Sequence, residues 1–180
     1  MPIFKVGDEY ADIDFELLSR HLQLLDVEIA EINAAIKKSG SPESDGLLDS
    51  GEYFIGNGFV AIQRYLTATR AGLGIPQSIA LSAPPMIKSN VPLAEALNAG
   101  ASYWKHMEEW IEVINRPEEE DLKGNALRTL EKLEKVTPWA DYTCSNLLAI
   151  LVEGSEFALS PLLSGLAEWR NNLMSLRTAS

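Results

Sequence analysis

A row of apolar residues near the start of the chain constrains the fold more than any other feature. Its members recur at alternating intervals of three and four residues and end before Gly40; they are Phe15, Leu18, Leu22, Leu25, Ile29, Ile32 and Ile36. This spacing places all of them on one face of an α-helix. The sequence therefore predicts a long amphipathic helix that begins at Asp12 or Asp14, either of which can serve as its N-cap, and ends near Lys38.

A second row with the same spacing runs through the middle of the chain. It consists of Leu93, Leu97, Gly100, Trp104, Met107, Ile111 and Ile114. Two helices of this length present continuous apolar faces that can pack on each other or on shared neighbours. A chain of 180 residues is long enough for one sizeable core and too short for two unrelated domains. We predict an all-α fold, a single-domain helical bundle over residues 1–180 with about six helices and one long irregular connection.

The segment after Gly40 has two interpretations. Asp49 and Glu52 have the spacing of a capping box, which indicates a helix that continues through Thr69. Alternatively, the Gly56-Asn57-Gly58 sequence could form the tight turn of a β-hairpin between residues 53–55 and 59–62. We favour the helix, with glycines that let a neighbouring backbone approach closely, because the three-and-four spacing continues through Ile55, Phe59, Ile62 and Leu66.

Prolines, acidic residues and capping residues predict where the other helices begin and end. Residues 72–92 carry four prolines and form the long connection, with room for one short turn near residues 78–81. The acidic run 118–121 suits the first turn of a fourth helix. Thr137-Pro138 and Ser160-Pro161 resemble caps followed by proline at the first helical position, so we expect them to open the last two helices.

Charge and cysteine content restrict the partners and the compartment. Fifteen Lys and Arg against 26 Asp and Glu give a net charge of −11, which disfavours nucleic acid as a partner. Cys144 is the single cysteine, so no internal disulfide forms, which suits a reducing compartment. Residues 1–14 lack the features of a signal peptide, and the longest apolar run, residues 147–152, is far shorter than a membrane span. We expect a cytoplasmic protein that does not bind a membrane.

Candidate functional residues concentrate on the helix that we predict from Pro92 to about Asn115. Beside its main row runs a second one, formed by Ala99, Tyr103, His106, Trp110 and Val113. The apolar face is therefore wide, which is typical of a central helix, and it predicts that His106 is partly shielded from water. We favour a packing role in which His106 donates a hydrogen bond to a neighbouring helix; the other interpretation is an acid/base or substrate-contacting histidine. Tyr103, Trp110 and Arg64 are the candidate binding residues.

Several chemistries are disfavoured by the sequence. The two histidines, His21 and His106, have Leu18 and Tyr103 three residues earlier, whereas a di-iron bundle uses Glu at that position. We therefore expect no metal site, and no motif predicts a cofactor. Cys144 lies on a predicted inward face and is expected to be a small buried residue rather than a nucleophile. Arg64, Arg70 and Arg170 could bind an anion, but we favour ion pairs between these arginines and the many carboxylates.

The stretch Ala101-Ser102-Tyr103-Trp104-Lys105-His106 resembles the six-residue motif of HEPN proteins, which are small dimeric helical bundles of bacterial toxin–antitoxin and phage-defence systems. Ser102 matches the polar position and His106 the histidine, while Ala101 stands where the family has arginine. The resemblance implies metal-independent RNA cleavage at a dimer interface, with Ser102 and His106 as catalytic residues. The string from Tyr103 to Trp110 is also similar to other bacterial helical proteins, which implies no activity.

These observations lead to two functional hypotheses. We favour a non-catalytic protein that acts through protein–protein interaction in bacterial defence, toxin neutralisation or regulation, because acidic charge and an incomplete motif suit protein partners better than RNA. The long apolar rows also favour a homodimer. The alternative is a HEPN-like ribonuclease with an altered active site around His106.

Overall fold

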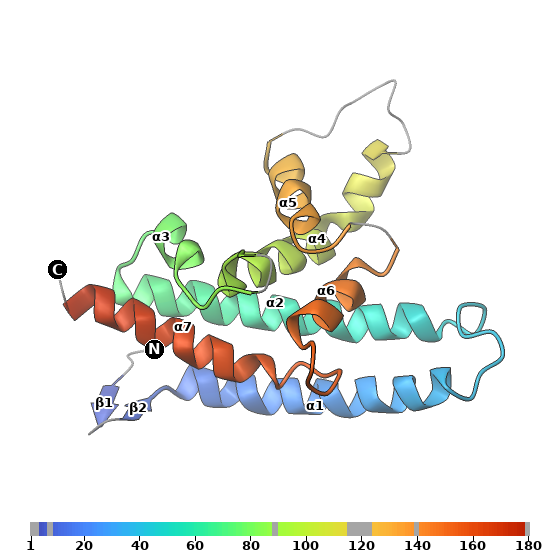
Figure 1. Ribbon diagram of the computed structural model, residues 1–180, viewed down its shortest axis with the longest axis horizontal. Coiled ribbons are helices and arrows are strands. Elements are labelled where there is room, and N and C mark those ends of the chain that lie inside the picture. The colour runs from blue at the N-terminus through green and yellow to red at the C-terminus, as the bar shows by residue number, and fades with distance from the viewer. Residues whose placement is uncertain (1–3, 7–8, 88–89, 115–123, 139–140, 179–180) are drawn as a thin grey trace.

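Helices make up nearly all of the regular structure (Figure 1). The computed structural model describes residues 4–6, 9–87, 90–114, 124–138 and 141–178. Within them lie seven helices: α1 (Ile13–Ile36), α2 (Leu47–Leu73), α3 (Gln77–Ser82), α4 (Leu93–Ile114), α5 (Asn125–Glu134), α6 (Thr143–Leu151) and α7 (Leu162–Thr178). Two short strands, β1 (Phe4–Val6) and β2 (Glu9–Ala11), pair antiparallel before α1. The predicted all-α bundle is confirmed.

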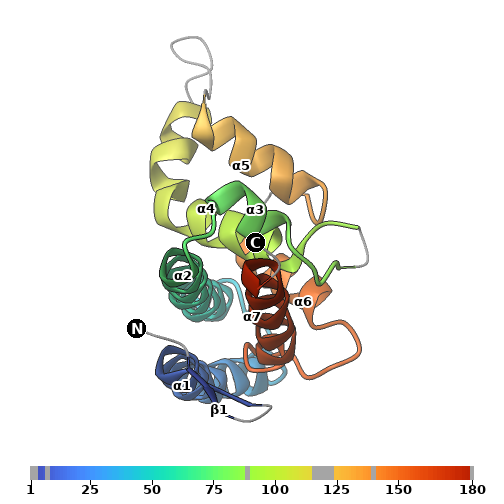
Figure 2. The same cartoon turned by 90° about the vertical axis from the view of Figure 1, so that its left-hand side faces the viewer.

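The helices are arranged around α2 and α4. Helix α1 lies at one edge of the molecule, α2 and α7 lie next to it, and α3, α4 and α5 lie beyond them (Figures 1 and 2). Helix α2 carries ten buried residues, among them Ile55, Phe59 and Ile62. The row predicted from residue 93 onward is buried at Leu93 and Leu97, and it packs at Gly100 against Phe59 and Leu147. Helices α1 and α5 are therefore separated by the core.

Local sequence signals predicted the first two helices, but not the start of the second. The expected capping box of Asp49 and Glu52 is wrong, because α2 begins at Leu47 after Gly46 and the Glu52 carboxylate binds the first turn of α6. The Asp12 side chain caps α1 by accepting a hydrogen bond from the Phe15 backbone N–H at 3.0 Å. Residues 53–66 are helical, as favoured, and form no hairpin. However, the glycines of α2 do not admit a neighbouring backbone as expected. A methyl group on Gly56 would overlap the Trp104 ring, and one on Gly58 would overlap Leu159, so these glycines make room for large side chains.

The later helix boundaries differ from the predictions. The long connection contains a complete short helix, α3, which makes the helix count seven instead of about six. Helix α5 begins at Asn125 after Gly124, and the acidic run 118–121 that was expected to open it lies outside the described residues. Ser160-Pro161 directly precedes α7, in agreement with the prediction.

The expectation that Thr137-Pro138 opens a helix is wrong, because α6 begins at Thr143. The buried carboxylate of Glu52 on α2 accepts hydrogen bonds from the backbone N–H groups of Cys144 and Ser145, at 2.6 and 2.8 Å, and from the Ser145 hydroxyl at 2.7 Å. A carboxylate at this position satisfies the free N–H groups of the first turn and complements the helix dipole. The start of α6 is therefore set by a residue about ninety positions away in the chain.

Candidate functional site

A cleft between α3, α4 and α5 brings together several of the predicted site residues. We call it the α4–α5 cleft; its volume is about 420 Å³. Helix α3 contributes Gln77 and Leu81, α4 contributes Asn98, Ala99, Ser102, His106 and Trp110, and α5 contributes Asn125, Arg128, Thr129 and Lys132. Its volume falls in the range of small-molecule sites. The three helices that line the cleft lie on the side of the molecule away from α1 (Figures 1 and 2).

Ser102 is held in a polar network that links α2 to α4. The Gln63 side-chain nitrogen donates to the Ser102 hydroxyl at 3.1 Å and to the Asn98 side-chain oxygen at 3.0 Å, and the Lys105 ammonium donates to the Gln63 side-chain oxygen at 2.7 Å. No hydrogen bond joins Ser102 to His106 in the described part of the chain. The pair therefore lacks the direct contact through which a histidine would activate a hydroxyl.

His106 is more exposed than the sequence indicated. Its side chain is 48% accessible, and the nearest charged partner of its Nδ1 atom is Glu109 on the same helix, at 3.4 Å. The imidazole stacks on the Trp110 ring, with 6.0 Å between ring centroids and an interplanar angle of 16°. The expectation of a hydrogen bond to a neighbouring helix is wrong, because the Glu109 contact lies within α4. The expected partial shielding extends to only about half of the side chain, which lines the open cleft.

Tyr103 and Trp110 are both buried, but they have different neighbours beyond α4. The Tyr103 ring packs edge-on against Trp110, with centroids 6.1 Å apart, and its hydroxyl hydrogen-bonds to Thr143 of α6. Burial raises the pKa of the Tyr103 hydroxyl, and the Thr143 hydrogen bond opposes this effect. Trp110 lines the cleft, whereas Tyr103 joins α4 to α6. Of this pair, only Trp110 is placed to contact a ligand in the cleft.

Arg64 lies in a different part of the molecule. It is exposed on α2 and lines a second cleft of about 340 Å³ between α1 and α2, together with Asp14, Leu17 and His21. The predicted binding residues are thus divided between two clefts and the α4–α6 contact.

The basic residues of the α4–α5 cleft were not among the predicted site residues. Asn125, Arg128 and Lys132 follow one another at intervals of three and four, so they share one face of α5. This signal was present in the sequence, but only the packing of α5 shows that the face turns toward His106. The Lys132 ammonium forms an ion pair with Glu95 of α4 at 2.9 Å, while Arg128 is exposed. No group of three potential metal ligands occurs among the described residues.

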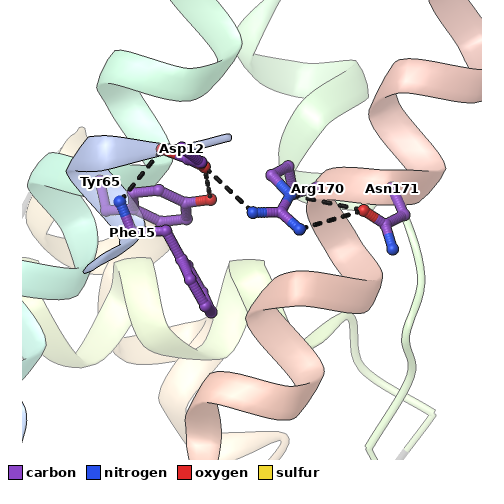
Figure 3. Close-up of polar contacts among 5 residues, drawn as sticks. All are labelled: Asp12, Phe15, Tyr65, Arg170 and Asn171. Atoms are coloured by element: carbon purple, nitrogen blue, oxygen red, sulfur yellow. Dashed lines mark hydrogen bonds and ion pairs between the residues drawn. The ribbon is translucent and has the colours of Figure 1, made fainter. Parts of the chain in front are cut away.

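A buried polar cluster explains the environment of Arg170 (Figure 3). The Asp12 carboxylate accepts from the Arg170 guanidinium at 3.2 Å and from the Tyr65 hydroxyl at 2.8 Å. The guanidinium also lies over the Phe15 ring, 5.1 Å from its centroid. Burial, followed by the hydrogen bond to Asp12, raises the pKa of Tyr65. The predicted ion pair of Arg170 is confirmed, and the cluster joins α1, α2 and α7 rather than forming an open site.

Cys144 is fully buried, as expected for a packing residue. Burial raises the pKa of its thiol well above the usual value, and the nearby Glu52 carboxylate adds to the shift. Because the thiolate is the nucleophilic form, this environment disfavours a catalytic role.

The outer face of α1 is a second candidate surface. Four large apolar side chains, each more than half accessible, follow this face: Ile13 at 53%, Leu17 at 54%, Leu24 at 68% and Val27 at 56%. We call them the α1 outer row. Large apolar residues that gather on one exposed face are typical of interaction surfaces.

Comparison with known proteins adds no further assignment. No protein-family model, curated protein or solved structure matches the chain. None of the described helices is long and apolar enough to cross a membrane. The two clefts and the α1 outer row are therefore the candidate functional surfaces of the described residues.

Proposed function

We propose that this protein is a non-catalytic helical protein that acts by binding another protein, and that the α1 outer row is its binding surface. The observation that carries this proposal is the exposure of four large apolar side chains along one face of a helix at the edge of the bundle. Burying such side chains against a partner is favourable by about 25 cal/mol for each Å² removed from water. A protein surface supplies that apolar contact, whereas a nucleic acid would face a chain of net charge −11.

In-cell photo-crosslinking tests this proposal. Leu24, the most exposed member of the row, is replaced by a photoreactive phenylalanine derivative in the cell that naturally makes the protein. The matched control carries the same group at Ala149, which is exposed on α6. We expect a protein adduct from position 24 that disappears when Leu17→Asp is added to the same chain. An absence of adducts from position 24, or equal adducts from both positions, would overturn the proposal.

One observation favours the alternative function, a HEPN-like ribonuclease with an altered site. Arg128 lines the same cleft as Ser102 and His106, so it could supply the cation that Ala101 lacks. The test is cleavage of RNA by metal-free protein, with His106→Gln and Arg128→Gln as the site variants. His21→Gln, at the exposed second histidine, is the control. The ribonuclease hypothesis requires activity that both site variants lose and the control keeps; no cleavage by the unmodified protein would remove it.

A further inference from the structure

The regular spacing on the outer face of α1 includes more residues than the four apolar ones. Ile13, Leu17, Leu24 and Val27 occupy positions of a row in which intervals of four and three alternate, and Arg20 fills the gap between Leu17 and Leu24. The same row continues through Glu31 and Ala34, and all of these residues are exposed. This is the heptad spacing with which two helices pack side by side along their length.

The two charged members of the row decide how a second helix can pair with it. In a parallel pair of identical helices, Arg20 would face Arg20 and Glu31 would face Glu31, and both contacts are repulsive. In an antiparallel pair with Leu24 opposite the partner's Val27, the two-fold axis places Arg20 opposite the partner's Glu31 and Leu17 opposite the partner's Ala34. Both charged positions then meet an opposite charge, and Leu17, Leu24 and Val27 meet apolar residues of the partner, while Ile13 lies beyond the end of the partner's helix.

We infer that α1 pairs antiparallel with α1 of a second copy of this chain, with Leu24 and Val27 at the centre and two symmetric Arg20–Glu31 ion pairs. This inference rests on the proposed function, since it uses the same α1 outer row, and it specifies the partner as an identical chain. Neither Arg20 nor Glu31 forms an ion pair within the part of the chain that the structure describes. Both are therefore available for the partner.

The ordered state of α1 within the monomer also favours this pairing. Helix α1 spans 24 residues, or about 36 Å at 1.5 Å per residue, and it is already held by its inner face against α2. Pairing of the outer face therefore orders only side chains and not the helix itself, which lowers the entropic cost of association. The contact is isologous, because the same surface serves both copies.

The association test measures mass against concentration. The unmodified protein is expected to shift from 19.8 kDa toward twice that mass in sedimentation and light-scattering experiments. Arg20→Glu or Glu31→Arg alone places like charges opposite each other at two symmetric positions and weakens the dimer by roughly tenfold or more. The double variant, Arg20→Glu with Glu31→Arg, restores the pairs and the dimer. Glu108→Arg, on the exposed face of α4, is the charge control and leaves association unchanged. Circular dichroism verifies that each variant is folded.

The orientation is tested by disulfide formation. An equimolar mixture of Leu17→Cys and Ala34→Cys chains is expected to form a mixed disulfide dimer under mild oxidation, while neither chain alone does so. The antiparallel arrangement separates Leu17 from the partner's Leu17 by about 25 Å along the axis, whereas a parallel one would place them side by side. The native Cys144 is fully buried and does not compete.

The outcomes separate this inference from the proposed function. A protein that remains at 19.8 kDa at every concentration, or a charge-swapped double variant that fails to recover the dimer, overturns the antiparallel pairing. If such a protein still forms an adduct with a different protein from position 24, the proposed function stands and only the second copy is excluded. If it forms neither a dimer nor an adduct, both are overturned.

Discussion

Helices α1 and α2 are similar in length and in apolar spacing, but they have different places in the molecule. Helix α1 has 24 residues, of which three are buried, while α2 has 27 residues, of which ten are buried. Helix α2 is covered by α1, α4 and α6, whereas α1 lies at the edge and keeps one apolar row in solvent (Figures 1 and 2). An apolar row with helical spacing therefore predicts a helix reliably, but it does not distinguish a core face from a binding face.

The two helices are also held by different forces. Helix α2 is held by large side chains that fill the core, such as Phe59 and Ile62. Helix α1 combines its few core residues with carboxylates that bind other elements. Asp12 binds Arg170 of α7, and Asp26 accepts a hydrogen bond from the Ser160 backbone at 3.0 Å. Substitutions on both helices test this division.

Substitutions of core and of surface apolar residues should lower the free energy of unfolding by very different amounts. Phe59→Ala on α2 removes a fully buried ring and is expected to lower the free energy of unfolding by about 3–5 kcal/mol. Leu24→Ala on α1 removes an exposed side chain and should cost less than about 0.5 kcal/mol in the monomer. Urea unfolding at low protein concentration measures both. Equal losses would show that the outer row of α1 is covered within the monomer, contrary to its exposure.

The polar attachment of α1 is tested at Asp12. Asp12→Ala removes the carboxylate that accepts two buried hydrogen bonds, from Arg170 and Tyr65, and a partly buried one from the Phe15 backbone. We expect a loss of about 3 kcal/mol, because a buried guanidinium loses its carboxylate and α1 loses its N-cap. Glu16→Ala, at an exposed acid of the same first turn, is the control and should change stability by less than about 0.5 kcal/mol. A similar small effect at Asp12 would mean that the apolar inner face alone holds α1.

Two glycines of α2 should respond in opposite directions to the same substitution. Gly56→Ala forces a methyl group into the space of the Trp104 ring and should destabilise the protein by about 1–3 kcal/mol. At Gly51 the nearest atom to an added methyl group is a carbon of Ile32 at 3.8 Å, an ordinary contact. Gly51→Ala should therefore stabilise the helix by roughly 0.5–1 kcal/mol. Thermal unfolding distinguishes the two, and a stabilising Gly56→Ala would contradict the packing of α4 on α2.

The smallest expected effect is a dependence of stability on alkaline pH. The pKa of Tyr65 is raised in the folded protein from its usual value of 10.0, so above that pH the unfolded chain releases a proton that the folded chain retains. Stability should therefore fall as the pH rises above about 10, with a slope from one such group of at most about 1.4 kcal/mol per pH unit. Tyr65→Phe should make the fall shallower, whereas Tyr53→Phe, at an exposed tyrosine of the same helix, should not. Parallel pH profiles for both variants would assign the effect elsewhere.

Much of the fold follows from local rules. The spacing of apolar residues predicted α1, α2 and α4 because each helix buries a face, and burial requires that spacing. Asp12 and Ser160-Pro161 were recognisable as helix starts, since the physics of capping involves only a few neighbouring residues. The burial of Cys144 was predicted from its place on an apolar face, and the ion pair of Arg170 from the excess of carboxylates over basic residues.

The candidate sites required the tertiary structure. The start of α6 depends on Glu52, and the α4–α5 cleft depends on how α5 packs against α4; neither contact is encoded in local spacing. The same holds for His106, whose position in an apolar row predicted partial shielding but not that its exposed half would line a cleft with residues of α5. By itself, the sequence determined which residues form helices and which faces of those helices are apolar. Only the packing decided which apolar face entered the core and which one remained for a partner, because burial is a property of neighbours that are distant in the chain.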